Sequence, residues 1–323
     1  MINCAIAGLG RWGRNLVDAA SHLDRLKITR AVETDLKGTR GFCADRKIDL
    51  SDRLDSVLDD PAIDAVLLAT PHSLHRAQVI AAAAKEKQVF CEKPLALRSD
   101  HAREMFDACR KANVVLAVGH NRRFWPSMRA LREIVTSGEL GTILHVEGHN
   151  SNENSNSITQ GWRLSPEESP GGGLTGAGLH VLDGFVSLLG PARQVYARLS
   201  SREVGPPPLD SAMLAIDFAS GVTATLATVR ATPFYWRVHV FGTNGFAEAR
   251  DEDTLRIGYI GKALQERTFA KVDSLRAMAE AFADSVERRA PFLITPHELV
   301  DVTAAFEAVV TSLATGATVA VPE

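Results

Sequence analysis

Three segments of the chain carry residues that could do chemistry. The segment Gly8-Leu9-Gly10-Arg11-Trp12-Gly13 follows an apolar run and has the glycine spacing of a dinucleotide site. The tripeptide Glu92-Lys93-Pro94 lies further along, and Gly171-Gly172-Gly173 leads toward His180 in the second half. Imidazole, with an unperturbed pKa of about 6.5, can take a hydroxyl proton while hydride leaves the carbon. These residue types therefore suit nucleotide-dependent oxidation of an alcohol.

The glycine segment predicts a sharp turn between a buried strand and a helix. Gly8 would allow the turn, Gly10 would let a pyrophosphate approach the backbone, and Gly13 would let the helix pack on the sheet. The helix would begin at Arg11, with Trp12 in its first turn, and its unpaired amides suit phosphate oxygens. An ordinary glycine turn is the alternative, but a strand before and a helix after favour the nucleotide site.

Glu33 ends the second apolar run, about 20 positions beyond the glycine segment. A carboxylate there can accept hydrogen bonds from both ribose hydroxyls of NAD, but it would repel the 2'-phosphate of NADP unless an arginine compensated. The next residue is Thr34, which favours NAD over NADP. In the alternative interpretation Glu33 is merely solvated and Asp35 caps the following helix.

His180 is the candidate proton acceptor because of the residues around it. A glycine-rich stretch leads into it and Asp183 follows three residues later, whereas a lone histidine is more often structural. No other histidine has comparable context, although His72 and His75 lie in a segment that follows another expected strand.

In this order, the three segments resemble the glucose-fructose oxidoreductase, inositol dehydrogenase and rhizopine catabolism (Gfo/Idh/MocA) family. The resemblance implies that Lys93 contacts the cofactor ribose and the substrate oxygen, where its ammonium stabilises the alkoxide-like charge that develops in hydride transfer. It also implies that the flanking residues Glu92 and Pro94 belong to the cofactor site. The segment 69–75 resembles the family's loop beside the nicotinamide ribose, which adds four cofactor contacts: Thr70, Pro71, His72 and His75.

The chain departs from the family pattern one helical turn before His180. Most members have an aspartate there, completing a Lys/Asp/His set, whereas this chain has Gly176. On an α-helix Gly176 would share the face of His180 and could not orient or polarise its ring. A substitute carboxylate, a water, or a mechanism of Lys93 and His180 alone would have to serve, and we expect Asp183 to anchor the helix.

Five residues form the expected substrate wall, with His180 as a sixth. They combine guanidinium groups with aromatic and amide side chains: Asn121, Arg122, Arg123, Trp162 and Arg163. Arginine binds carboxylates bidentately and also donates to polyol oxygens. Alternatively, Arg122 and Arg123 hold the domain junction through backbone carbonyls. The substrate class is accordingly a polyhydroxylated or carboxylate-bearing small alcohol.

The elements that position these residues fall into two domains. Residues 1–120 alternate apolar runs with helix-like stretches, which predicts a Rossmann-type doubly wound parallel sheet. We expect its strands at 2–7, 28–33, 65–69, 89–91 and 114–118, and its helices to begin at Arg11, after Asp35, at His72 and after Ser99. Residues 121–323 predict an α+β substrate and oligomerisation domain with a large, mostly antiparallel open sheet.

In this second domain we expect a helix over 124–137, a strand over 142–148, and a loop over the Asn- and Ser-rich stretch 150–160. Hairpin-spaced strands follow at 212–218, 222–229, 236–242 and 245–250, and helices at 272–288 and 296–315. The strands have many apolar residues for an uncovered face: Met213, Ala215, Leu226, Val238 and Val240. Their burial between copies would make a homodimer or homotetramer through this sheet, as the family resemblance also implies.

Composition limits the partners. The net charge of −3 gives no electrostatic case for nucleic acid or anionic lipid, so a small molecule is favoured. No apolar run reaches the roughly 18 residues that span a bilayer, and no signal segment precedes the first strand. Four cysteines without metal-ligand spacing suggest no metal and reduced thiols in the cytoplasm.

The sequence thus predicts an NAD-dependent dehydrogenase acting on a secondary alcohol of a sugar, cyclitol or related small compound. A nucleotide-binding sensor with little or no turnover is the alternative, which Gly176 favours and the pair of Lys93 and His180 disfavours. A third possibility is an oxidoreductase that recycles its nucleotide without releasing it.

Overall fold

The computed structural model describes residues 1–153, 161–201, 210–230 and 232–322. It divides into two compact units. The first comprises residues 1–96, 100–121 and 273–299, and the second comprises residues 97–99, 122–272 and 300–323. None of the helices in the described part has the length and apolar character that a membrane crossing requires.

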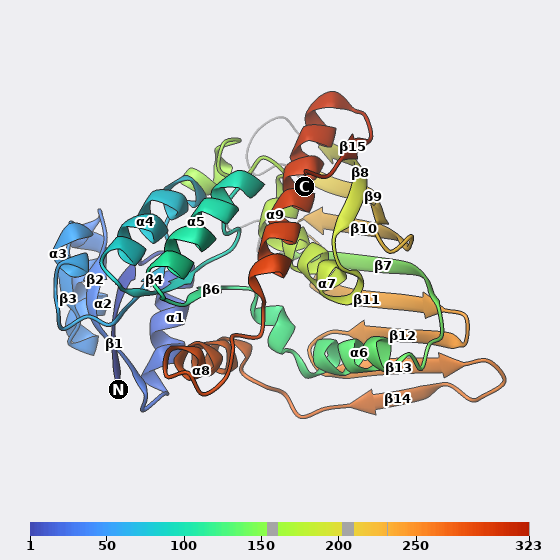
Figure 1. Ribbon diagram of the computed structural model, residues 1–323, viewed down its shortest axis with the longest axis horizontal. Helices are drawn as coiled ribbons and strands as arrows, with labels where there is room; N and C mark the ends of the chain where they lie inside the picture. Colours follow the sequence, from blue (N-terminus) through green and yellow to red (C-terminus); the bar gives the residue numbers. More distant parts are fainter. Residues whose placement is uncertain (154–160, 202–209, 231, 323) are drawn as a thin grey trace. The chain divides into compact units, whose positions relative to one another are not determined.

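The first unit is built on a parallel sheet of six strands (Figure 1). The strands are β1 Ile2–Ala7, β2 Leu26–Val32, β3 Asp49–Ser51, β4 Ala65–Leu68, β5 Gln88–Cys91 and β6 Leu116–Val118. Their order in the sheet is β3-β2-β1-β4-β5-β6, so the chain changes direction across the sheet after β3, between β1 and β4. This confirms the predicted doubly wound fold, in which ligands bind at the carboxyl ends of the strands beside such a switch.

Helices connect these strands. They are α1 Arg11–Ser21, α2 Leu36–Arg46, α3 Asp55–Leu58, α4 His72–Ala84 and α5 Ser99–Lys111. The starts of α1, α2, α4 and α5 agree with the sequence prediction, whereas β3 and α3 were not predicted. Both are short, and β3 has no fully buried side chain, so neither produces an apolar periodicity.

A helix from near the C-terminus completes the first unit. Helix α8, Ser274–Val286, packs on α1, and its Phe282 meets Phe90 of β5 edge to face at 5.8 Å between ring centroids. Arg25 also pairs with Asp284, at 2.8 Å. The expected division at residues 120 and 121 assigned this helix to the second domain. The contacts of the chain place residues 273–299 with the first unit instead.

The second unit contains a sheet of nine strands in the order β14-β13-β12-β11-β7-β10-β9-β8-β15. The strands are β7 Ile143–Asn152, β8 Ala192–Ser201, β9 Asp210–Phe218, β10 Thr223–Arg230, β11 Tyr235–Gly242, β12 Gly245–Arg250, β13 Thr254–Tyr259, β14 Gln265–Thr268 and β15 Val319–Ala320. All neighbours are antiparallel except β7 and β10. The predicted, mostly antiparallel sheet is therefore confirmed.

The second sheet differs from the prediction in one boundary and in four strands. Strand β7 continues to Asn152, so the predicted loop begins later, and residues 154–160 of that loop lie outside the described part. Strands β8, β13, β14 and β15 were not predicted. β14 is exposed along its whole length and lacks the apolar alternation that marks a half-buried strand.

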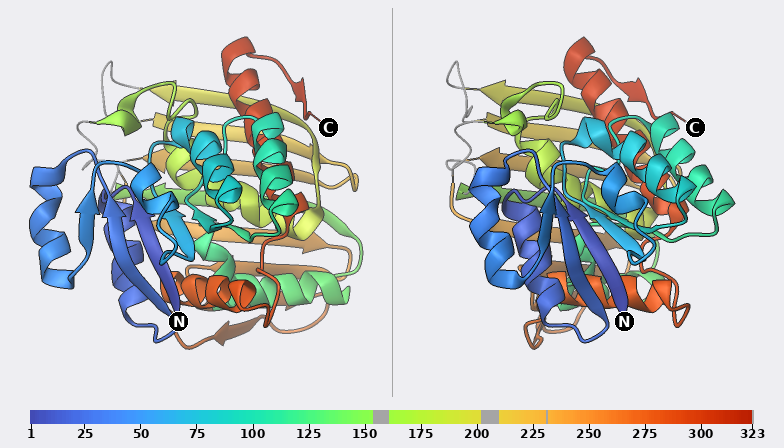
Figure 2. Two further views of the ribbon diagram at one scale, coloured as in Figure 1. Left: turned by 60° about the vertical axis from the view of Figure 1, so that its left-hand side comes forward. Right: turned by 90° about the vertical axis from the view of Figure 1, so that its left-hand side faces the viewer.

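Helices α6 Pro126–Ser137, α7 Leu179–Leu189 and α9 Pro296–Thr315 cover one face of this sheet, as Figures 1 and 2 show. Their apolar side chains and the inward side chains of the strands form one core. Leu226, Val238 and Val240 are part of that core, so the expectation that they lie on the uncovered face is wrong. Met213 and Ala215 do lie on the uncovered face, which we call the open face, and Met213 is 51% exposed.

Substitution of Phe282 tests the assignment of α8 to the first unit. Phe282 is 1% exposed, so Phe282→Ala should lower the free energy of unfolding by about 3–5 kcal/mol because it leaves a cavity against Phe90. Urea unfolding measures this value. The same substitution at Phe234, which is 43% exposed, should cost about 1 kcal/mol or less. Equal losses for the two variants would contradict the packing.

Candidate functional site

The glycine segment of the first unit has two glycines that the protein itself requires and one that it does not. A Cβ at Gly8, whose φ is +90°, would lie 2.6 Å from the carbonyl oxygen of Ala69, and a Cβ at Gly13 would overlap the Gly8 carbonyl. A Cβ at Gly10 would meet no atom within 4 Å. No protein contact excludes a side chain there, as expected where a pyrophosphate must approach the backbone.

The N-terminus of α1 is also suited to a phosphate. Gly10 is its N-cap and provides no side-chain hydrogen bond, and the first turn holds no acidic residue. The first amides of the helix therefore meet no carboxylate from that turn, and their partial positive charge favours an anion. Arg11 is exposed beside Trp12, with its guanidinium 5.8 Å from the ring centroid.

Glu33 is fixed against the glycine segment. The amide of Leu9 donates to Glu33 Oε2 at 2.7 Å, and the amide of Thr34 donates to Oε1 at 2.8 Å. The carboxylate therefore lies beside the turn rather than free in solvent. Asp35 does cap α2, by accepting from the amide of Gly38 at 3.0 Å, so the two acids have separate tasks.

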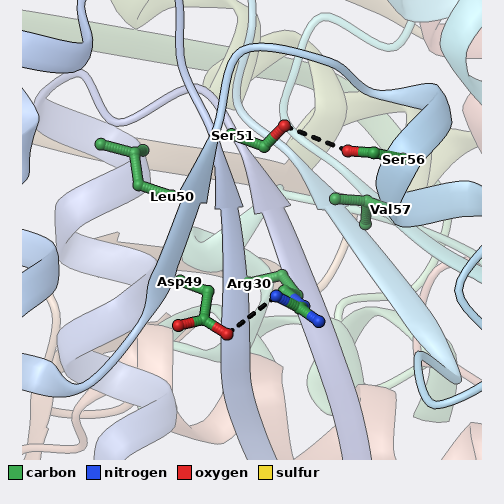
Figure 3. Close-up of a pocket in the computed structure, with 6 residues that line it drawn as sticks. All are labelled: Arg30, Asp49, Leu50, Ser51, Ser56 and Val57. Atoms are coloured by element: carbon green, nitrogen blue, oxygen red, sulfur yellow. Dashed lines mark hydrogen bonds and ion pairs between the residues drawn. The ribbon is translucent and has the colours of Figure 1, made fainter.

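A hollow of about 300 Å³ lies on strands β2 and β3 close to Glu33 (Figure 3). The amide of Glu33 donates to the carbonyl of Ser51, which lines it. At one end the hydroxyls of Ser51 and Ser56 are 3.0 Å apart, and at the other Arg30 pairs with Asp49 at 2.8 Å. These polar groups satisfy one another, so the hollow offers few donors to a ligand.

His75 joins the two loops that the sequence assigned to the nicotinamide end. Its ring is fully buried, with Nδ1 3.0 Å from the carbonyl oxygen of Pro94 and Nε2 3.2 Å from that of Thr70. The hydroxyl of Thr70 in turn donates to Gln78 of the same helix at 2.6 Å. His75 is therefore enclosed by protein and links the two loops through these carbonyl groups. His72 and Pro71, in contrast, are partly exposed.

The Glu92-Lys93-Pro94 segment directly follows β5, and the peptide bond between Lys93 and Pro94 is cis. Glu92 is buried, and its carboxylate accepts from the amide of Lys93 at 3.3 Å. A Cβ at Gly119 would lie 2.8 Å from Glu92 Oε1, so the glycine after β6 makes room for this carboxylate. Lys93 itself is half-buried.

In the second unit, His180 is the second residue of α7 and is buried. The turn before it, Leu174–Gly178, is π-helical, and the amide of Leu179 donates to the carbonyl of Leu174. Hydrogen bonds in a π turn close over five residues rather than four. That Gly176 shares the face of His180 stays a prediction. Gly176 is exposed, and a Cβ there would meet no atom within 4 Å.

The two neighbouring arginines have different environments. Arg123 is buried, with its Nε 3.5 Å from the carboxylate of Asp183 on α7. Asp183 therefore contacts a cation that helps to anchor the helix. Arg122 lies over the rings of Trp125 and Trp236, at 4.9 and 4.3 Å from the centroids. Burial among these rings lowers the pKa of Arg122 to about 9, with Glu252 opposing the shift.

The remaining substrate candidates belong to different units. Asn121 belongs to the first unit, where its amide donates to the hydroxyl of Ser274 at the start of α8, at 2.9 Å. Trp162 and Arg163 form a short turn in the second unit, with the guanidinium 4.2 Å from the indole centroid. Within the described residues, no group of three or more His, Cys, Asp or Glu side chains could hold a metal ion.

Asn150 was missed because the sequence prediction placed it in a loop. Its amide nitrogen donates to the carbonyl of Ala177, in the π turn, at 2.7 Å. The signal was the alternation of Val146, Gly148 and Asn150, which face inward at the period of a strand.

Two family models and several known proteins match the chain. Residues 2–120 match the model of an oxidoreductase family with an NAD-binding Rossmann fold, and residues 128–248 match the model of the GFO/IDH/MocA C-terminal domain. The chain is 29% identical to 2,7-anhydro-N-acetylneuraminate hydratase of Escherichia coli over 80% of its length and 71% of the relative's. It is 30% identical to scyllo-inositol 2-dehydrogenase (NAD(+)) of Bacillus subtilis over 76% and 72%.

Solved structures share the fold. A levoglucosan dehydrogenase in complex with NADH and levoglucosan superposes with a TM-score of 0.89 at 22% identity, covering all of both chains. At this identity the likeness concerns the arrangement of the elements only.

Cofactor titrations test the role of Glu33. The wild-type chain should bind NAD more tightly than NADP, and Glu33→Ala should weaken NAD binding about 10- to 100-fold because a charged hydrogen bond is worth about 1.5–3 kcal/mol. Isothermal titration with each dinucleotide measures both values. Asp35→Ala is the matched control and should leave NAD affinity unchanged. Tighter binding of NADP by the wild type would remove the assignment.

Proposed function

The chain belongs to the Gfo/Idh/MocA family of oxidoreductases, and from this membership we propose that Lys93 and His180 carry out hydride-transfer chemistry on a hydroxylated substrate. The protein is an NAD(P)-dependent oxidoreductase acting on CH–OH groups, with NAD as its cofactor. Its substrate is a sugar, a cyclitol or a related small hydroxylated compound. We further propose a cytoplasmic location.

One observation supports the cofactor site most directly. At Gly10 a side chain would contact no atom of the described residues, whereas packing requires glycine at Gly8 and Gly13 of the same segment. The residues present fit a dinucleotide: the free first turn of α1 for the pyrophosphate, Glu33 for the adenosine ribose, and the loops braced by His75 for the nicotinamide ribose.

In the proposed mechanism, His180 accepts a proton and Lys93 stabilises a developing negative charge. Bound NAD supplies the acceptor for the hydride that leaves the substrate carbon. The imidazole of His180 takes the proton of the substrate hydroxyl through a ring nitrogen. The ammonium of Lys93 donates a hydrogen bond to the same oxygen and stabilises the negative charge that develops on it before the carbonyl forms. Reduction runs through the same steps in reverse.

Replacement of Lys93 tests this assignment after a screen of sugars, cyclitols and hydroxy acids has identified a substrate by NADH absorbance. Lys93→Ala should abolish turnover but leave NAD affinity within about tenfold, since the glycine segment and Glu33 hold most of the dinucleotide. Steady-state kinetics and NAD titration measure the two effects. Lys85→Ala, an exposed lysine paired with Asp59, is the control and should keep full activity. Full activity in Lys93→Ala would overturn the assignment.

One relative favours a second candidate function. The Escherichia coli protein is named a hydratase, and addition of water involves no net oxidation. An enzyme that recycles tightly held NAD within each turnover would account for such an activity in this family. Purified protein that carries the absorbance of a bound dinucleotide, with no release of NADH during turnover, would support this function over the first.

We also propose that the open face of the second sheet joins copies of the chain. On this face His239 lies between Glu147 and Glu248 on the neighbouring strands, with its ring 4.0 Å from that of Phe241. Neither ring nitrogen of His239 has a hydrogen-bond partner in the described part of the chain. Desolvation lowers the pKa of His239, opposed mainly by Glu248. This polar row, on the same face as the exposed Met213, suits a second copy of the same face.

Light scattering at micromolar concentration tests the assembly. The mass should be at least twice that of one 34.9 kDa chain, and Met213→Arg should shift it toward the monomer by placing unpaired charges in the interface. Ile260→Arg, which changes an exposed residue of the turn after β13, should leave the mass unchanged. A monomeric wild type would exclude the sheet-mediated dimer.

A further inference from the structure

The π-helical turn Leu174–Gly178 directly precedes α7, the helix that carries His180, and it packs on two central strands of the second sheet. It contacts β7 and β10, which lie side by side in parallel. Thr228 of β10 and Asn150 of β7 are register partners, and Trp236 of β11 is the next residue of the same row. This row of three polar side chains lies on the helix-covered face of the sheet.

Asn150 binds the turn directly. Its Nδ2 donates to the carbonyl of Ala177 at 2.7 Å, and the acceptor fixes which end of the amide faces the turn. Asn150 is 0% exposed, so this hydrogen bond has no competition from bulk water. Ala177 is three residues before His180, within the π turn where helical hydrogen bonding is irregular.

Glycines bring the backbone close enough for this bond. A Cβ at Gly178 would lie 2.6 Å from Cγ2 of Thr228, so the backbone of the turn lies directly against the side chain of Thr228. On β7, a Cβ at Gly148 would overlap Val181 and lie 2.6 Å from the ring of Phe185. The inward positions of β7 therefore contact the chain on both sides of His180.

Burial of this polar row lowers the free energy of unfolding, which argues against a purely stabilising role. Asn150 Oδ1, Thr228 Oγ1 and Trp236 Nε1 are buried and have no hydrogen-bond partner among the described residues. Each such group in a core typically costs about 1–3 kcal/mol. An apolar row of the same volume would pack under the turn at lower cost, so the donor at Asn150 serves a purpose other than stability.

We propose that Asn150 is a positioning residue that holds the π turn, and thereby sets the place of the His180 imidazole. Its role rests on the proposed function of His180, because positioning matters only if that ring exchanges a proton with substrate. Loss of the donor would remove the side-chain hydrogen bond to the carbonyl of Ala177 and let the turn relax toward regular α-helix. The imidazole of His180 would then shift, and a misplacement of about 1 Å can lower the rate about 100-fold.

The test uses two variants and one control in the full chain. Asn150→Leu keeps the branching of the side chain at Cγ but removes the donor, and Asn150→Ala removes both. Val146→Ala is the control because Val146 is equally buried on the same face of β7, and its loss leaves a cavity away from Ala177. All three should lower the melting temperature, so stability alone does not separate them.

Kinetics and histidine NMR separate positioning from packing. Both Asn150 variants should lower kcat about 10- to 100-fold, change the KM for NAD less than about threefold, and shift the pH dependence of kcat. Val146→Ala should change none of these values. In ¹³C-histidine-labelled protein, the His180 resonance, assigned with His180→Gln, should move in both Asn150 variants and stay in place in the control.

The NMR result does not require a substrate, so it distinguishes the two proposals. If the resonance moves but no alcohol is oxidised, the proposed function fails and the positioning contact stands. If the resonance and kcat of both Asn150 variants match the wild type, Asn150 does not position His180. Equal changes in the control would likewise overturn the inference, since packing would then explain them.

Discussion

Both units depend on close contacts that glycines allow where a helix begins beside a sheet. In the first unit Gly13 touches Gly8, which in turn lies against the carbonyl of Ala69. In the second, Gly178 lies against the side chain of Thr228, and Gly148 lies against the side chains of Val181 and Phe185 on α7. Dense packing makes such contacts intolerant of even one methyl group. They fix the start of α1 and of α7, and those two helix starts hold the groups assigned to phosphate and to proton exchange.

Contacts around these helix starts use different chemistry in the two units. Around α1 the partners are backbone amides, an uncapped turn and the single carboxylate of Glu33. Around α7 a buried ion pair of Arg123 with Asp183 and the amide of Asn150 hold the helix. Breaking one partner of a buried pair leaves an uncompensated charge, so this anchor resists local displacement. The nucleotide side is open to a ligand, whereas the histidine side is held by the protein.

The sequence predicted those parts of the fold and site that local pattern determines. Buried parallel strands are apolar runs, so β1 and β4 were found, and glycine spacing located the turn after β1. The carboxylate of Glu33 follows from its place at the end of a strand. Residues defined by distant partners were not predictable in this way. Nothing local in the sequence shows that His75 contacts the carbonyl of Pro94, or that the turn before His180 is π-helical.

The discontinuity of the first unit also bears on how the chain is made. Helix α8, which covers Phe90 and α1, is synthesised about 150 residues after the last strand of its own sheet. At about 5–20 residues per second, the ribosome needs roughly 8 to 30 s to reach it. For that interval the nucleotide-binding sheet must persist with one apolar surface bare, while the second unit emerges as an insertion between its parts. A nascent chain of this design depends on chaperone shielding longer than one whose domains follow one another in sequence.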